Sequence, residues 1–316
     1  MIAIEEDENG LHRVLAELRI DLGPLSLEEA TTVLGIRPTR SGDAHDAHLQ
    51  ADDAGERPAR QDIWFLSSEE AVSGRDMAQH IDWLIEALCP VQGALRQLRQ
   101  AGARATTITC AIWSADGGAF VDLTSQQISK LKELGVGLEF DIICSAPGRD
   151  PVMTALAARC WPYQPPAPLP RGADDPRCER ADVHLCIYLD AFDPSYVTEV
   201  LGTVPTSTCQ KGRTVTNSLG LVRTNPLNAW FLSSEPVVLS KEFRLHMDWM
   251  LDQIHPLQGK IQALRDDGVQ NFKLNCYWWS ASGYGGPILE PDQISRLADL
   301  ALDCFFSFSY YGLDDD

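Results

Sequence analysis

The chain repeats itself at a fixed spacing, and this duplication constrains its fold more than any other feature. Residues 64–69 read Trp-Phe-Leu-Ser-Ser-Glu, and the same six letters return 166 residues later at 230–235. Two more motifs return at that spacing, namely His-x-Asp-Trp at 80–83 and 246–249 and Trp-Ser-Ala at 113–115 and 279–281. A period this long exceeds that of solenoid repeats and indicates a duplicated domain. Residues shared by the copies are those the fold requires, whereas residues that differ are free to specialise one copy.

Each copy predicts the same succession of elements. In the first copy Met77, Ile81, Leu84, Ile85 and Leu88 form one apolar stripe of an amphipathic helix. A proline follows the stripe in both copies, at Pro90 and Pro256, and predicts a sharp kink or two abutting helices. Alternating apolar residues predict strands before and after this helical region, and a Gly-containing loop is expected after the third strand.

These patterns predict an α+β protein of two homologous modules, each β-α-β-α-β-α-β. A four-stranded sheet with helices on one face is favoured over a parallel doubly wound sheet, because two strands alternate as a half-solvated sheet would. The expected organisation is a first module at 1–146, a Pro-rich linker at 147–182 and a second module at 183–316. Proline-rich segments are stiff and extended, so the linker is expected to act as a spacer.

The net charge of the chain is −19, with an acidic excess of 12 in residues 1–150 and of 7 in residues 151–316. Such a field repels phosphate backbones, which argues against nucleic acid as a partner and favours encounter with a basic protein. Simple solubility explains the charge equally well. No apolar run reaches the ~20 residues needed to cross a bilayer, and the acidic start does not resemble a signal peptide. Nine scattered cysteines without a C-x-x-C pair fit a reducing cytoplasm.

None of the sequence motifs contains a complete set of catalytic or metal-binding residues. His80 and Asp82 are two residues apart on a helix and point away from each other, so a structural role is favoured over a base and its orienting acid. The serines at 67–68 lack a nucleophile-elbow motif and are expected to satisfy backbone groups or cap helices. Histidines and aspartates at 43–48 lie in a loop, and the second copy lacks these side chains. The glycines at 283–286 match no phosphate-binding motif. We therefore expect no enzyme activity, no cofactor and no metal.

With Leu-Gly-x-x-Pro-Thr, Trp-x-Leu-Ser-Ser, His-x-Asp-Trp and Trp-Ser-x-x-Gly in place, the chain resembles a bacterial family called domain of unknown function 4279. The resemblance covers 18–146 and 185–311. It implies a small cytoplasmic α+β domain without an established enzyme activity, in a family some of whose members look like immunity proteins encoded beside toxins. Family members usually carry one copy, so the tandem is a departure.

The resulting hypothesis is a cytoplasmic immunity protein that binds and neutralises a basic toxin through acidic surfaces. The residues expected to contact the partner are those where charge concentrates and the copies differ, namely Asp43, Asp46, Asp52, Asp53, Glu56, Glu69 and Glu70. The alternative is an enzyme or small-ligand sensor with a site between the modules, and a third interpretation is a scaffold subunit.

Overall fold

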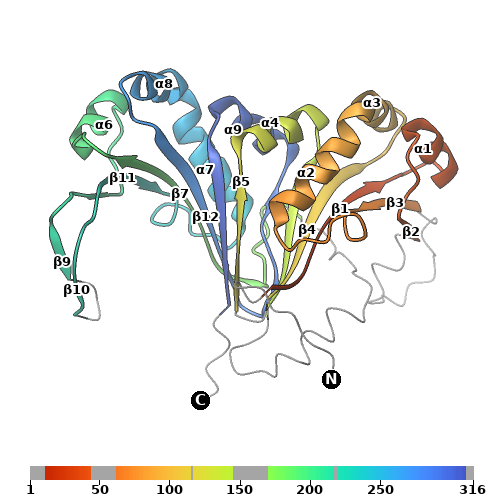
Figure 1. The fold of residues 1–316 in the computed structure, drawn as a ribbon, viewed down its shortest axis with the longest axis horizontal. Helices are drawn as coiled ribbons and strands as arrows, with labels where there is room; N and C mark the ends of the chain where they lie inside the picture. Colours follow the sequence, from red (N-terminus) through yellow and green to blue (C-terminus); the bar gives the residue numbers. More distant parts are fainter. Residues whose placement is uncertain (1–10, 44–61, 115–116, 145–169, 217–219, 311–316) are drawn as a thin grey trace, which may run out of the picture.

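The computed structural model describes residues 11–43, 62–114, 117–144, 170–216 and 220–310. Two mixed sheets meet near the middle of the molecule and spread apart from there, and the helices lie along one side (Figure 1). Sheet A contains β1 (Leu11–Asp21), β2 (Arg40–Asp43), β3 (Asp62–Ser67), β4 (Ala105–Ser114), β6 (Gly137–Cys144), β13 (Tyr284–Gly285) and β14 (Ile288–Leu289). Sheet B contains β5 (Gly118–Leu123), β7 (Cys178–Leu189), β8 (Ser207–Cys209), β11 (Asn228–Ser233), β12 (Asn271–Ser280) and β15 (Asp303–Ser309).

The helices follow the duplication. The first copy supplies α1 (Leu27–Leu34), α2 (Met77–Leu88), α3 (Gln92–Gln100) and α4 (Ser125–Leu134). The second copy supplies α6 (Pro194–Leu201), α7 (Phe243–Ile254), α8 (Gln258–Asp266) and α9 (Pro291–Leu300). Short 3₁₀ turns at Cys89–Val91 and His255–Leu257 contain the two prolines and separate α2 from α3 and α7 from α8, which confirms the predicted interruption.

The predicted fold class is confirmed: two homologous α+β modules, with helices packed on one face of each sheet. The apolar stripe of α2 is buried throughout, and Asp76 caps the helix by accepting from the amide of Ala78. The predicted strands of the first copy are β1, β3, β4 and β6. Among them β4 and β6 run parallel and the other neighbours antiparallel, and β12 and β15 repeat the parallel pair in sheet B.

The sheets are wider than four strands because each half donates an edge strand to the other. Strand β5 follows β4 in the chain, yet it pairs with β15 of the second half, where Phe120 lies opposite Ser307. Reciprocally, β13 and β14 follow β12 and pair with β6 of the first half. The expectation of a plain loop after the third strand was therefore wrong. The segment's pairing partner lies in the other module, where no local pattern indicates it.

Aromatic side chains fill the seam where the sheets meet. The ring of Phe140 on β6 lies 4.5 Å from that of Phe306 and 5.2 Å from that of Phe308, both on β15, measured between centroids. All three are at most 1% exposed and belong to one continuous apolar core that includes both modules. Burying a phenylalanine side chain contributes ~1.5–3 kcal/mol, so the seam is a substantial part of the fold's stability.

The donated strands approach the seam closely because they carry glycine. A Cβ atom at Gly286 would lie 2.5 Å from the Phe140 carbonyl oxygen, and one at Gly118 would lie 2.9 Å from that of Phe308. Neither position leaves room for a side chain without a shift of backbone, so glycine is required at both.

Cutting the linker tests this exchange. We expect a protein with a protease site inserted between Pro166 and Ala167 to remain one particle after complete cleavage, because each fragment holds an edge strand of the other's sheet. Gel filtration of cut and uncut protein, with the fragments resolved on a denaturing gel, provides the measurement. Fragments that separate without denaturant would contradict a reciprocal exchange.

Candidate functional site

The repeated serine and histidine form a buried brace in each module. The Ser68 hydroxyl donates to His80 Nδ1 over 2.7 Å and accepts from the amide of Ala16 over 2.9 Å, while His80 Nε2 donates to the carbonyl of Gly74 over 2.9 Å. In the second module Ser234 Oγ lies 2.8 Å from His246 Nδ1 and equally close to an oxygen of Asp182, so its single proton is shared between these two acceptors. Burial lowers the pKa of both histidines, which keeps the rings neutral. A hydroxyl and ring held in this way have structural roles.

The aspartate of His-x-Asp-Trp has a different partner from the histidine. Asp82 accepts from Nε2 of Gln127 over 2.8 Å, and Asp248 accepts from Gln293 over 2.7 Å. Each glutamine also completes the capping box at the start of α4 or α9. The motif therefore ties one helix to the next, and it does not assemble an acid–base pair.

Among the residues expected from the sequence to contact a partner, only Asp43, Glu69 and Glu70 are described. Asp43 ends β2, whereas Asp46, Asp52, Asp53 and Glu56 lie outside the described residues. Glu70 is exposed in the turn after β3. Glu69 accepts from Arg13 Nε over 2.6 Å, and the Arg13 guanidinium lies over the ring of Trp113 at 4.5 Å. This Trp–Arg–Glu cluster joins two of the repeated motifs, and spacing alone does not reveal it.

The second module repeats the cluster in a more open form. Arg180 pairs with Glu235 and lies over Trp279 at 4.7 Å. The Arg180 side chain is 49% exposed, whereas that of Arg13 is 14% exposed. The same contact is thus accessible in sheet B and largely covered in sheet A.

The open cluster continues into an aromatic surface on sheet B. We call the face of sheet B opposite α7 and α9 the outer face. Aromatic side chains stand on it in pairs: Tyr277 stacks on Trp279 at 5.6 Å, and Phe120 stacks on Phe305 at 5.6 Å. Tyr188 meets Phe231 edge to face at 6.1 Å. Phe120 is 67% exposed, and the others are half-buried. A sheet face this rich in accessible rings is typical of a binding surface.

Corresponding positions of sheet A are smaller or buried. Register places Ala111 where sheet B has Tyr277, and Leu15 where it has Asp182. Phe65 corresponds to Phe231 but is 3% exposed and lies beneath the Arg40 guanidinium. The copies therefore share the fold of this face and differ in its chemistry, as expected where one copy has specialised.

A buried carboxylate organises the centre of the outer face. Asp182 is 1% exposed and accepts from the Ser233 hydroxyl at 3.1 Å, the Glu235 amide at 3.0 Å and His184 Nε2. The Ser234 hydroxyl, 2.8 Å away, shares its proton between Asp182 and His246. Burial opposes its ionisation, but the bonds from His184, Ser234 and Ser233 outweigh burial and lower the pKa of Asp182. His184 is thereby held with its ring edge to face against Tyr277, at 5.1 Å.

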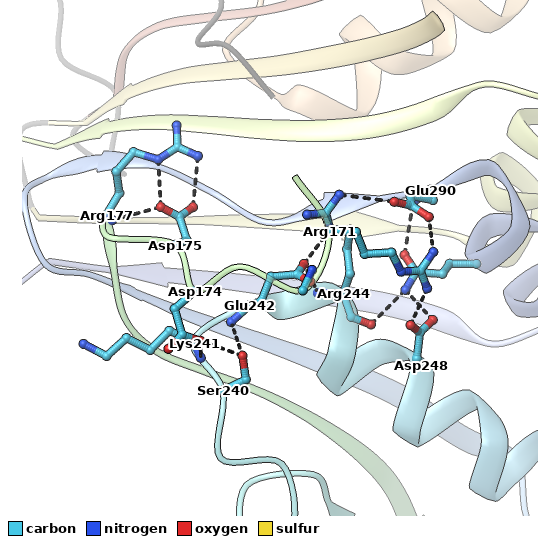
Figure 2. A network of polar contacts seen from close by, with 12 residues as sticks. Arg171, Asp174, Asp175, Arg177, Ser240, Lys241, Glu242, Arg244, Asp248 and Glu290 are labelled. Atoms are coloured by element: carbon cyan, nitrogen blue, oxygen red, sulfur yellow. Dashed lines mark hydrogen bonds and ion pairs between the residues drawn. The ribbon is translucent and has the colours of Figure 1, made fainter. Parts of the chain in front are cut away.

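A second polar network fixes the chain where it enters the second module. Figure 2 shows Arg171 between Glu290, at the start of α9, and Asp248 of α7. Arg244 pairs with Glu242 and Glu290, and Arg177 with Asp175 (Figure 2). Because Arg244 and Glu242 are buried, removing one partner would leave an uncompensated charge, so this network is an anchor.

A small pocket of about 20 Å³ lies beside this network, lined by Asp175, Glu242, Arg244, Trp278 and Gly286 among others. An enzyme or sensor site between the modules would be expected here, because Gly286 belongs to the exchanged segment. Asp175, Glu242 and Arg244 are engaged in ion pairs, which gives them a structural role. Within the described ranges, no group of three or more His, Cys, Asp or Glu side chains could hold a metal ion. No helix of that part is long and apolar enough to cross a membrane.

Fold and surface define a class of protein: a tandem α+β chain whose modules share a scaffold and differ in one sheet face. The family model described as Domain of unknown function (DUF4279) matches residues 12–145 and again 178–313, so the chain belongs to this family and carries its domain twice. Comparison with curated proteins and with solved structures gave no match.

Replacing Asp182 tests the polar centre of the outer face. The pKa of Asp182 is lowered in the folded protein, so the stability it contributes is present above its unfolded pKa of ~3.9 and is lost as the pH falls through the lower, folded value. We expect Asp182→Asn to reduce the free energy of unfolding by ~1–3 kcal/mol at neutral pH, because several donors lose a charged acceptor. Urea denaturation should show this difference narrowing below about pH 4.

The matched control is Asp122→Asn, on the same face but exposed, for which a change within ~0.5 kcal/mol is expected. A difference for Asp182→Asn that stays constant from neutral to acidic pH would contradict the ionised network.

Proposed function

We propose that this chain is a non-enzymatic interaction protein that binds another protein through the outer face of sheet B. The observation that carries the proposal is the row of accessible aromatic rings beside Arg180, held by a buried carboxylate at its centre. Trp, Tyr and Arg dominate the energetics of protein interfaces, because they bury a large area and keep a polar group for bonding. Rigid rings also lose little conformational entropy on binding.

The partner that we propose is a toxin with a basic surface, which the chain neutralises in the bacterial cytoplasm as an immunity protein. The net charge of −19 supports this proposal, since an acidic field accelerates encounter with a basic protein. Membership of a family whose relatives include immunity-like proteins supports it further.

The acidic residues and the aromatic face would act at different stages of binding. Exposed carboxylates such as Glu70 act at long range and raise the association rate. Glu69 contributes less to this field, because Arg13 neutralises it. The outer face acts in contact and sets the lifetime of the complex.

A photo-crosslinking side chain at position 277 tests the location of the interface in the native host. We expect a partner to be joined at this position but not at position 97, where Gln97 is exposed on α3, remote from sheet B. The same partner joined at both positions, or at position 97 alone, would place the interface elsewhere.

With that partner in hand, the double variant Tyr277→Ala, Trp279→Ala is expected to weaken binding about 30- to 1,000-fold, because it removes the stacked centre of the face. Reversing Asp43, Asp46, Asp52 and Asp53 to Lys should instead slow association and leave dissociation nearly unchanged. Surface plasmon resonance separates the two rates, with Gln97→Ala as the control. The proposal assigns the association rate to the acidic residues and the dissociation rate to the aromatic face. Dissociation that is accelerated by the charge reversals and unaffected by the aromatic substitutions would refute it.

A further inference from the structure

A hairpin on the far edge of sheet B differs from the rest of the molecule in charge and exposure. After β8 the chain leaves the sheet, forms β9 (Thr214–Thr216) and β10 (Val222–Thr224), and returns as β11. The two strands form a separate two-stranded sheet that projects from the edge, on the side away from α6 and α8 (Figure 1). We call residues 207–216 and 220–228 the arm.

The arm is basic in an acidic protein. It carries Lys211, Arg213 and Arg223 and no carboxylate, which gives it a charge of +3. Because the whole chain carries −19, the remaining residues together carry −22. All three cations are exposed, and none forms an ion pair with a carboxylate in the described part of the chain. Their electrostatic attraction is therefore available to another molecule.

Apolar exposure accompanies the charge. Leu221, just before β10, is 64% exposed, and Val222, the first residue of β10, is 67% exposed. An isolated two-stranded hairpin is marginally stable in water, so the arm would gain stability from a surface that covers it.

The complementary surface lies at the same end of the molecule, on α6 and α8. Five exposed carboxylates gather there without ion pairs to described cations, namely Asp190, Asp193, Glu199, Asp266 and Asp267. Tyr196 donates to Asp267 and stacks on Phe192 at 5.0 Å, which places aromatic area beside the acids. We call this group the acidic cap.

We propose that the arm docks on the acidic cap of a second copy of this chain, and that the two copies form a symmetric dimer. Because the arm and the cap lie at one end of the molecule and on opposite sides of it, a twofold axis at that end brings each arm to the other copy's cap (Figure 1). Such an isologous contact satisfies both surfaces at once. The charge of −22 on the rest of the chain disfavours nucleic acid as the occupant. The dimer does not rest on the toxin proposal, since the arm and the acidic cap share no residue with the aromatic rings of the outer face.

Sedimentation velocity of the full chain over a concentration series tests the dimer directly. We expect reversible dimerisation that weakens as salt rises, because exposed charge pairs are screened. The variant Lys211→Glu, Arg213→Glu, Arg223→Glu should weaken dimerisation about 10- to 100-fold, from three cross-interface pairs of ~0.5–1 kcal/mol each. Reversing Arg37, Arg96 and Arg104 to Glu changes the net charge equally and should leave more of the dimer intact, since these exposed arginines lie outside the arm and the cap.

Charge exchange distinguishes docking from general repulsion. Asp190→Lys, Glu199→Lys, Asp266→Lys should also weaken dimerisation about 10- to 100-fold. Combining these changes with the arm reversal should restore it, because the new pairs are again opposite in sign. Circular dichroism melting of each variant separates loss of docking from loss of fold. A wild-type chain that stays monomeric throughout, or a combined variant that fails to recover, would overturn the proposal.

Discussion

Reciprocal donation of an edge strand is the constraint on which the rest of this structure depends. Because β5 completes sheet B and β13 and β14 complete sheet A, neither half closes its own sheet. Phe140, Phe306 and Phe308 then join the sheets through a common core. The halves are fixed to each other by strand pairing and burial, and the linker between them need not set their orientation. The outer face of sheet B consequently holds a constant position relative to sheet A.

Within this frame, the copies have kept what the scaffold requires and changed what it does not. The Ser–His brace, the Asp–Gln contact and the Trp–Arg–Glu cluster occur in both. Asp182 of sheet B stands at the position that Leu15 occupies in sheet A, so the centre of this face is polar in sheet B and apolar in sheet A. A buried charge is costly unless its bonds are made, and here four groups donate to it. The cost of burying the Asp182 charge argues that this difference between the copies serves binding specificity on the second module.

The sequence predicts what depends on local periodicity and punctuation. The stripe of α2, the interruption at Pro90 and the strands flanking the helices all follow from residues close together in the chain. The exchange of β5 does not, because its partner strand lies about 180 residues away and its own pattern of alternation fits any sheet edge. The outer face escaped prediction for a related reason. Tyr277 and Trp279 alternate with Cys276 and Trp278 along β12, and periodicity does not say which side the helices cover.

Net charge and local charge give different information about binding, and the two need separate treatment. The total of −19 acts on every approaching molecule and favours a basic one regardless of where it lands. Pairing decides the contacts: Glu69 and Glu235 are already neutralised by arginines, while Lys211, Arg213 and Arg223 have no described carboxylate beside them. Three exposed cations thus gather on the arm and the accessible rings on the outer face, at separate places on sheet B. A dimer joined through the arms would present two outer faces at once, so a multimeric partner would be held by avidity beyond the strength of either face.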